Sequence, residues 1–210
     1  LIKKFKIEIP TKIMKYLRSA DANAPTPSDP IFFSNESTIV ASASKMLKVV
    51  AAYARTMNFE VEVLSADVQG EAAKIARQHA EYVIKLLGRI RHNPILLLSG
   101  GETTVKLDGT SGRGGRNTEY LLSLAVELAD RCDFIAIAAD TDGIDGSEMN
   151  AGAFADQGTV SRIKNLGLNP IALLNNHDAY SAFEADDNLF FTGPTGTNLN
   201  DFRAILINGY

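Results

Sequence analysis

The chain has 210 residues, 45% of them hydrophobic and 22% charged, and its formal net charge at pH 7 is −4. These proportions are typical of a globular protein, and the acidic balance argues against a nucleic-acid surface, which needs a basic face. A single cysteine excludes internal disulfides and cysteine-based metal sites. No apolar stretch approaches the ~18 residues of a membrane span, and no signal-peptide pattern opens the chain. No membrane partner and a cytoplasmic location are therefore expected.

Residues 1–92 are predicted to contain two strands and two main helices in alternation. That order favours parallel pairing of the strands. Two strands make a poor sheet alone, so partner strands from outside the chain are expected. The predicted elements are a short helix near Thr11–Arg18, a proline-rich loop at Ala24–Pro30, a buried strand at Thr38–Ala41, a helix capped by Ser42, a strand at Phe59–Leu64 and a helix at Gly70–Leu87.

Residues 93–210 are predicted to alternate strands and helices around further buried segments. The apolar stripe of Asn117–Ala129 gives the strongest helix signal. The expected fold class is α/β with mainly parallel or mixed sheets. The predicted strands are Ile95–Leu98, Thr103–Leu107, Phe134–Ala139, Leu189–Phe191 and Phe202–Ile207, and the other helices are Thr159–Asn165, Pro170–Leu174 and Ala179–Phe183.

Four glycine-rich polar clusters lie in the second half of the chain, and three of them directly follow a predicted strand. Open α/β sheets bind ligands outside the carboxyl ends of their strands. Glycines there let backbone N–H groups approach an anion, while Asp, Arg, Thr and Asn side chains supply charge and hydrogen bonds. We therefore predict one anionic-ligand site built from four loops: Ser99–Thr104, Gly112–Asn117, Asp140–Gly146 and Thr192–Asn198.

The cluster Gly112–Asn117 immediately precedes a predicted helix. Backbone donors at a helix N-terminus and the positive end of the helix dipole attract phosphate or carboxylate. Arg113 and Arg116 add bidentate donors suited to such oxygens. Because the charge of Arg116 opposes the dipole at the helix entry, its position indicates an anion that offsets it. The alternative is a flexible glycine loop with solvated arginines.

The acidic turn Asp140–Asp145 directly follows a buried strand. Mg2+ prefers one or two carboxylates together with the phosphates of a ligand. Asp140, Asp142 and Asp145 are therefore candidate metal ligands. The alternative, left open at this point, is a turn in which the Asp side chains hydrogen-bond their own backbone.

The two remaining clusters offer backbone and hydroxyl donors. Gly100 and Gly101 permit close backbone approach after a strand, but the segment fits neither a P-loop nor the dinucleotide fingerprint. Thr192–Asn198 can form a nest of backbone N–H groups, the alternative being a wide hairpin loop. No Ser-His-Asp or Cys-His arrangement is indicated, and His177, beside a helix cap, is predicted to be structural.

Taken in order, these motifs resemble the MOFRL domain of the two-domain glycerate kinases, over about Pro94 to Ile207. Upstream, Ser65–Ala72 resembles the last part of the first domain of that family. The resemblance implies a partial Rossmann-like unit in residues 1–92 and a MOFRL α/β domain in residues 93–210. The segments that carry it are Leu98–Val105, Gly112–Asn117 with Glu119, Asp140–Gly146 with Ala151–Ala153, and Thr192–Asn198 with Asn200 and Asp201.

The resemblance implies ATP-dependent phosphorylation of D-glycerate to phosphoglycerate, at the 2-hydroxyl, with ATP and Mg2+ as cofactors. The catalytic lysine of the family belongs to an N-terminal domain without a counterpart here. This chain is thus expected to supply half of an interdomain cleft, to need that missing domain as its partner, and to be inactive alone. Association into a homo-oligomer is left open.

The resemblance also implies roles for particular residues. Arg116 is the expected catalytic residue, which stabilises the transferring phosphoryl charge or grips the glycerate carboxylate. The expected substrate and nucleotide contacts are Gly100, Gly101, Glu102, Thr103, Gly114, Gly115, Asn117, Thr195, Gly196, Thr197 and Asn198, and the expected metal ligands are Asp140, Asp142 and Asp145.

Two other functions stay open. Many members of the family carry the name hydroxypyruvate reductase, an activity that would oxidise NADH or NADPH. The chain lacks the glycine fingerprint and the ribose-binding acidic residue that dinucleotide sites use. The third hypothesis is a non-catalytic small-anion-binding module that pairs with a separate N-terminal subunit.

Overall fold

The computed structural model describes residues 2–88, 93–106, 109 and 112–208. Contacts divide the chain into two compact units, one ending at Ile39 and the other beginning at Val40. The predicted helix near Thr11–Arg18 is confirmed in the first unit. That unit contains α1 (Ile2–Phe5), α2 (Thr11–Leu17) and the 3-10 turns η1 (Ala20–Ala22) and η2 (Pro30–Phe32).

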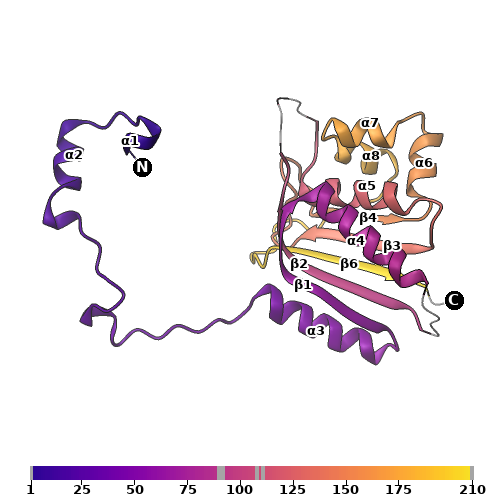
Figure 1. Cartoon of the computed structure of the whole chain (residues 1–210), viewed down its shortest axis with the longest axis horizontal. Coiled ribbons are helices and arrows are strands. Elements are labelled where there is room, and N and C mark those ends of the chain that lie inside the picture. The colour runs from indigo at the N-terminus through magenta and orange to yellow at the C-terminus, as the bar shows by residue number, and fades with distance from the viewer. Residues whose placement is uncertain (1, 89–92, 107–108, 110–111, 209–210) are drawn as a thin grey trace. The chain divides into compact units, whose positions relative to one another are not determined.

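The second unit is built on one six-stranded mixed sheet in the order β1-β2-β6-β3-β4-β5 (Figure 1). β1 and β2 pair in parallel, and the other neighbours pair antiparallel. The predicted α/β class with a mixed sheet is thereby confirmed. The strands are β1 (Glu60–Glu71), β2 (Ile95–Thr104), β3 (Phe134–Asp140), β4 (Gly152–Asp156), β5 (Leu189–Phe190) and β6 (Asp201–Ile207).

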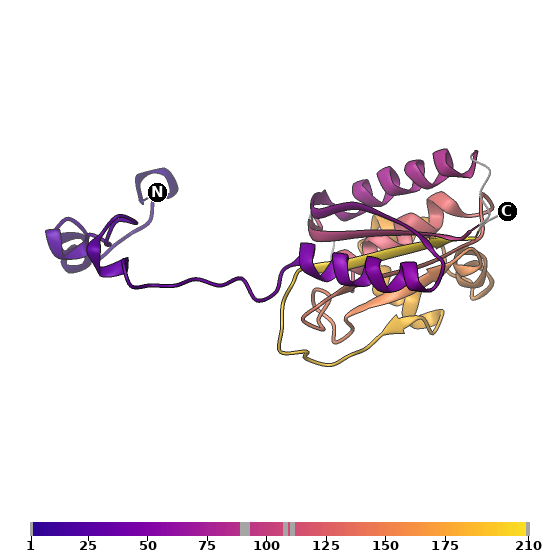
Figure 2. The ribbon, with the colours of Figure 1, turned by 90° about the horizontal axis from the view of Figure 1, so that it is seen from below.

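Helices cover the two faces of the sheet unequally, as the perpendicular views of Figures 1 and 2 show. Among the described helices of the second unit, α3 (Ala43–Thr56) alone lies on one face, and the Ser42 side chain caps it as predicted by accepting from the Lys45 N–H. The other described helices of the second unit cover the opposite face. They are α4 (Ala72–Leu87), α5 (Arg116–Leu128), α6 (Thr159–Asn165), α7 (Pro170–Asn175) and α8 (Ala179–Ala185).

The main hydrophobic core lies between the sheet and the layer of α4 and α5. Alternate residues of β6 point to that face, so Ile205 and Ile207 are buried, while Phe202 on the other face is only partly covered. Ten of the thirteen residues of α5 are buried in this layer. The N-terminus of α5 is consequently fixed against the sheet, and it carries Arg116.

The structure differs from the predicted elements in three places. The described segment around Thr38–Ala41 contains no strand, because an extended segment gains no ladder hydrogen bonds without a neighbouring strand. The predicted strand Ile95–Leu98 and the first two residues of the predicted strand Thr103–Leu107 belong to one continuous strand, β2, which ends at Thr104. Leu107 lies outside the described residues. β4 was not predicted, because its Gly-Ala-Phe-Ala-Asp sequence has low β-propensity. The predicted division at residues 92 and 93 stays a prediction, and β1 and β2 on its two sides share one sheet.

Gly101 explains why β2 continues through the Gly-Gly pair. Its φ is +113°, and a Cβ atom at this position would lie 2.2 Å from the backbone nitrogen of Val68 in β1. The register between β1 and β2 shifts at this level, between Ser65 and Val68. Only glycine fits this close approach and this backbone conformation. The glycine therefore serves strand packing, not a ligand-binding turn.

Acid is expected to destabilise the protein through His79 on α4. Its Nδ1 lies 2.8 Å from the Tyr120 hydroxyl, and burial, assisted by the charge of Arg203, lowers the pKa of His79 to about 4. Between pH 6.5 and 4 the unfolded chain therefore binds a proton that the folded chain does not. The stabilisation present above pH 6.5 should fall by about 3 kcal/mol by pH 4.

His79→Gln tests this expectation because glutamine does not titrate. The variant should be less stable than the parent at pH 7.5, by about 1 kcal/mol for the altered hydrogen bond, and more stable at pH 4. Urea unfolding followed by circular dichroism measures the difference in free energy of unfolding between the variant and the parent at both pH values. A difference that keeps its sign and size between these pH values would contradict the assignment.

Candidate functional site

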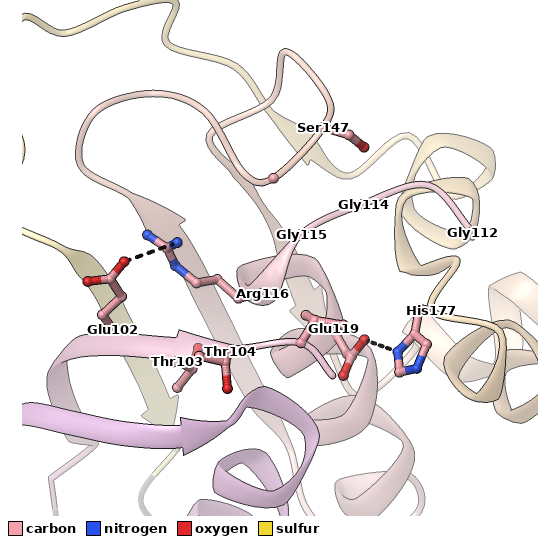
Figure 3. Close-up of a pocket in the computed structure, with 12 residues that line it drawn as sticks. Glu102, Thr103, Thr104, Gly112, Gly114, Gly115, Arg116, Glu119, Ser147 and His177 are labelled. Atoms are coloured by element: carbon pink, nitrogen blue, oxygen red, sulfur yellow. Dashed lines mark hydrogen bonds and ion pairs between the residues drawn. The ribbon is translucent and has the colours of Figure 1, made fainter. Parts of the chain in front are cut away.

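A cavity of about 560 Å³ lies at the N-terminal end of α5 (Figure 3). Residues from the end of β2, the glycine turn before α5, the first turns of α5 and the turn after β3 line it, together with His177. The structure thus brings part of the predicted site together. The predicted site residues that line this cavity are Glu102, Thr103, Gly114, Gly115 and Arg116.

The edge of the sheet beside this cavity carries three acidic side chains. β2 and β3 are both antiparallel to β6, so their carboxyl ends lie next to the start of β6. Asp201 pairs with Gly101 on one side and with Asp140 on the other. Glu102, Asp140 and Asp201 therefore meet around the same point, and Arg116 lies there.

Arg116, the first residue of α5, contacts all three carboxylates. Its Nε donates to Asp201 Oδ1 at 2.8 Å, its Nη2 donates to Asp140 Oδ2, and its Nη1 lies 3.5 Å from Glu102 Oε1. Asp140 and Asp201 are buried, whereas 58% of the Glu102 side chain is exposed. Two nitrogens of the guanidinium are thus fixed, and among the described residues the exposed Glu102 alone holds the third.

These contacts correct the electrostatic argument made from the sequence. The anions that offset Arg116 at the helix entry belong to the protein, so its position does not require an external ligand. Burial raises the pKa of Asp140 to about 6, although the Asp142 N–H and Arg116 act in the opposite direction. Arg203 also forms an ion pair with Asp201, so two arginines face the three carboxylates of this cluster. An anionic ligand must therefore take the place of Glu102 beside Nη1.

Asp145 occupies the anion-binding position that the sequence predicted for a ligand. Its carboxylate accepts from the backbone N–H groups of Asn117 and Thr118 at 2.9 and 2.8 Å, and from the Thr118 hydroxyl at 2.9 Å. Burial raises the pKa of Asp145, and these hydrogen bonds act against that shift. A side chain of the protein therefore caps α5, and Asn117 is buried beneath the cavity without lining it.

The acidic turn does not assemble a metal site in the described part of the chain. Asp145 caps α5, Asp140 pairs with Arg116, and Asp142 Oδ1 accepts from the Ile144 N–H at 2.9 Å. No group of three His, Cys, Asp or Glu side chains among the described residues could hold a metal ion. These oxygens already have protein donors and do not fit a resident Mg2+, so the turn follows the alternative of side chains that hydrogen-bond backbone.

Gly115 shows how tightly the acidic turn and the glycine turn pack together. A Cβ atom on Gly115 would lie 2.4 Å from the backbone oxygen of Asp145. A glycine is thus required here so that Asp145 can reach the first turn of α5. The predicted backbone donors of this turn are accordingly part of the capping structure.

Arg113 does not join Arg116 in a basic pocket. Its guanidinium lies 4.2 Å from the Tyr180 ring centroid and forms ion pairs with Glu184 at 2.9 Å and Glu148 at 3.4 Å. These hydrogen bonds and charges raise the pKa of Arg113. Arg113 therefore ties the glycine turn to α8 and the loop after β3, and Arg116 is the arginine of the cavity.

The fourth predicted loop packs against the acidic turn and does not line the cavity. Thr195 Oγ1 donates to the Thr141 carbonyl at 2.5 Å, and its N–H donates to the Asp142 carbonyl at 3.1 Å. Asn198 Nδ2 lies 3.4 Å from Asp142 Oδ2. Thr195, Gly196, Thr197 and Asn198 are exposed. Their role as ligand contacts stays a prediction, and in this structure they support the turn after β3.

Glu119 and His177 also line the cavity, although neither was among the predicted site residues. His177 Nδ1 lies 2.7 Å from Glu119 Oε2 (Figure 3). His177 was predicted to be structural because its neighbours resemble a helix cap. The signal that could have found the pair is the position of Glu119, one helical turn beyond Arg116 on the face that carries the cavity.

The fold and the site define an α/β protein with an arginine-centred cavity at one edge of a mixed sheet. Residues 95–201 match the sequence profile described as "MOFRL family". The chain belongs to the MOFRL family, and the resemblance inferred from the motifs is confirmed. Among the described residues, no helix is both long and apolar enough to cross a membrane.

Individual relatives give the same picture. The chain is 46% identical over 177 residues to an Agrobacterium vitis protein named "Putative hydroxypyruvate reductase", covering 82% of this chain and 40% of that one. It is 34% identical over 171 residues to the "Glycerate 2-kinase" of Pyrococcus horikoshii, covering 80% and 39%. A crystal structure of glycerate kinase from Thermotoga maritima superposes with a TM-score of 0.82 at 31% identity, covering 98% of this chain and 48% of that one. The chain thus spans less than half the length of these relatives.

Proposed function

We propose that this chain supplies one half of the active site of a glycerate kinase, which transfers a phosphoryl group from ATP to the 2-hydroxyl of D-glycerate. The observation that carries the proposal is Arg116, with two nitrogens fixed by buried carboxylates and the third facing a cavity beside an exposed one. The names of the relatives from Pyrococcus horikoshii and Thermotoga maritima, "Glycerate 2-kinase" and "D-glycerate 2-kinase", support the choice of substrate.

The geometry of Arg116 suits the chemistry of phosphoryl transfer. Catalysis of this reaction consists mostly of positioning and of electrostatic stabilisation of the transferring group. A guanidinium N–H group binds carboxylate and phosphate oxygens with charge-assisted hydrogen bonds. The substrate carboxylate or the transferring phosphoryl group would displace Glu102 and bind at Nη1 of Arg116. Since Asp140 and Asp201 hold the other nitrogens, the fork needs no reorganisation when the ligand arrives.

ATP and Mg2+ enter this proposal as a substrate complex. When bound with the nucleotide, Mg2+ would neutralise charge on the phosphates. The acidic turn after β3 provides no separate cluster to hold it among the described residues. We therefore assign the metal to the phosphates of ATP and assign the grip on the small acid to Arg116.

The chain spans less than half the length of these relatives, and this supports the proposal that it supplies only one half of the active site. The chain covers 39% of the Pyrococcus horikoshii relative and 48% of the Thermotoga maritima structure. Residues outside this chain would supply the other wall of the cleft. The N-terminal domain of the same enzyme is accordingly the proposed partner. The chain alone should not phosphorylate D-glycerate.

The test is an assay of ADP formation with ATP, Mg2+ and D-glycerate. The chain alone should give no turnover above a protein-free blank, and activity should appear when the missing half is added as a separate polypeptide. Full turnover from the chain alone would contradict the half-site. Protein-dependent loss of NADH or NADPH absorbance with hydroxypyruvate would instead favour a reductase, the function that the name of the Agrobacterium vitis relative indicates.

A further inference from the structure

Glu119 and His177 form a carboxylate–imidazole pair at the wall of the cavity. Glu119 lies in the first turns of α5, and 7% of its side chain is exposed. His177 follows α7, and 19% of its side chain is exposed. Its Nδ1 lies 2.7 Å from Glu119 Oε2, as the dashed line in Figure 3 shows. The buried carboxylate thus holds a partly exposed imidazole.

The hydrogen bond determines which ring nitrogen is available for chemistry. A carboxylate that accepts from Nδ1–H fixes that tautomer and leaves the lone pair on Nε2. The described residues offer His177 Nε2 no hydrogen-bond partner. His177 lines the cavity of Arg116 and also an adjoining cavity of about 390 Å³, which Arg77 and Lys106 line as well. Its ring therefore stands between two cavities, and its acceptor nitrogen is unused.

The backbone at His177 is also unusual. Its φ is +52°, in the left-handed region that costs energy for residues other than glycine. Such strain is retained where the surrounding structure imposes it, and it occurs preferentially at functional sites. Here the strained residue is the one that presents a polar ring to Glu119.

The charges around the pair are mixed. Burial raises the pKa of Glu119, the hydrogen bond from His177 lowers it, and the charges of Glu71 and Asp145 add to the upward shift. The cationic groups that line the same two cavities come from α4, the end of β2 and α5. The charged groups that face the pair are Glu71, Arg77, Glu102, Lys106, Arg116 and Asp145.

Building on the proposed function, we propose that His177 accepts the proton of the D-glycerate hydroxyl that becomes phosphorylated. The O–H bond of the substrate breaks and its proton moves to Nε2, while the oxygen forms a bond to the γ-phosphorus of ATP and ADP leaves. Glu119 is the positioning residue: it holds the ring and balances the imidazolium that forms. Arg116 binds the carboxylate of the same substrate across the cavity.

The experiment uses the chain labelled with 15N in its three histidines, with the His177 signals assigned by their loss in His177→Asn. Before any ligand is added, the spectrum should show Nδ1 protonated and Nε2 as an acceptor. Titration with D-glycerate should move the 15N resonance of Nε2 in the direction expected when this nitrogen accepts a hydrogen bond. Propionate, which has the carboxylate and no hydroxyl, should bind near Arg116 and leave Nε2 unchanged. D-lactate and 3-hydroxypropionate, each with one hydroxyl, distinguish which hydroxyl His177 receives.

Two variants test whether Glu119 positions the His177 ring or only contributes to the stability of the fold. Glu119→Gln should remove the single tautomer of His177 and the Nε2 shift, because an amide accepts or donates in place of the carboxylate. The matched control is Glu184→Gln, an exposed carboxylate on α8 that pairs with Arg113, and it should change neither signal.

The outcomes separate this inference from the proposed function. Binding of D-glycerate that shifts the amides of Gly115 and Arg116 but leaves Nε2 unchanged would overturn the role of His177 and leave the proposed function standing. An Nε2–H tautomer in the free chain would also overturn it. Absence of any D-glycerate binding would overturn both proposals together.

Discussion

Replacing Arg116 by glutamine is expected to weaken D-glycerate binding to this chain by about 10- to 100-fold. A charge-assisted hydrogen bond from Nη1 to a carboxylate is worth about 1.5 to 3 kcal/mol, which corresponds to that range. Arg116→Lys should recover little, because an ammonium group keeps the charge and loses the planar fork that Asp140 and Asp201 orient. Isothermal titration calorimetry measures the three dissociation constants.

The matched control for this substitution is Arg113→Gln, three residues earlier in the same turn. Arg113 pairs with Glu184 and Glu148, which lie outside the cavity, so D-glycerate binding should change by less than about twofold. Because Arg116→Gln also removes an ion pair from each of the buried carboxylates of Asp140 and Asp201, its amide spectrum must show a folded protein before its affinity is compared. A folded Arg116→Gln variant that binds within threefold of the parent would remove the basis of the proposed function.

The second large effect is expected at Asp145. Replacing Asp145 by alanine should lower the free energy of unfolding by about 4 kcal/mol. The variant loses the N-terminal cap of α5 and leaves buried donors of Asn117 and Thr118 without an acceptor. Urea denaturation followed by circular dichroism gives the value. The cavity should be lost with it, since Gly115 and Arg116 depend on the same cap.

Asp142→Ala is the control for Asp145→Ala within the same turn. Asp142 is only partly buried, and its Oδ1 accepts a single local hydrogen bond, from Ile144 at 2.9 Å. Its replacement should cost about 1 kcal/mol or less. Equal losses of stability for the two variants would show that Asp145 is no more important to the fold than the partly buried Asp142, contrary to the capping role.

The sequence predicted most of the elements but not how the clusters are used. Hydrophobic periodicity located α5 and β3 to within one residue, because both are buried and regular. It could not show that Gly101 lies inside a strand, because the close approach of Val68 depends on a pairing 33 residues away in the chain. The strand predicted at Thr38–Ala41 failed for the same reason: strands depend on partners that local sequence does not specify.

The site illustrates the same limit for charges. The sequence identified Arg116, Asp140 and Glu102 as neighbours in a site, since strand ends collect at one edge of a sheet. It could not show that Asp145 would take the helix N-terminus or that Asp140 would pair with Arg116, because one residue type serves as a cap, an ion-pair partner or a metal ligand. Glu119 and His177 were missed because 58 residues separate them in the chain.

A D-glycerate titration of the uniformly 15N-labelled chain, read by amide chemical shifts, tests the central claim most directly. If Arg116 receives the acid in the cavity, the shifts should concentrate at Thr104, Gly114, Gly115 and Ser147 and disappear in Arg116→Gln. Shifts confined to Thr195–Asn198, or unchanged by Arg116→Gln, would contradict the account.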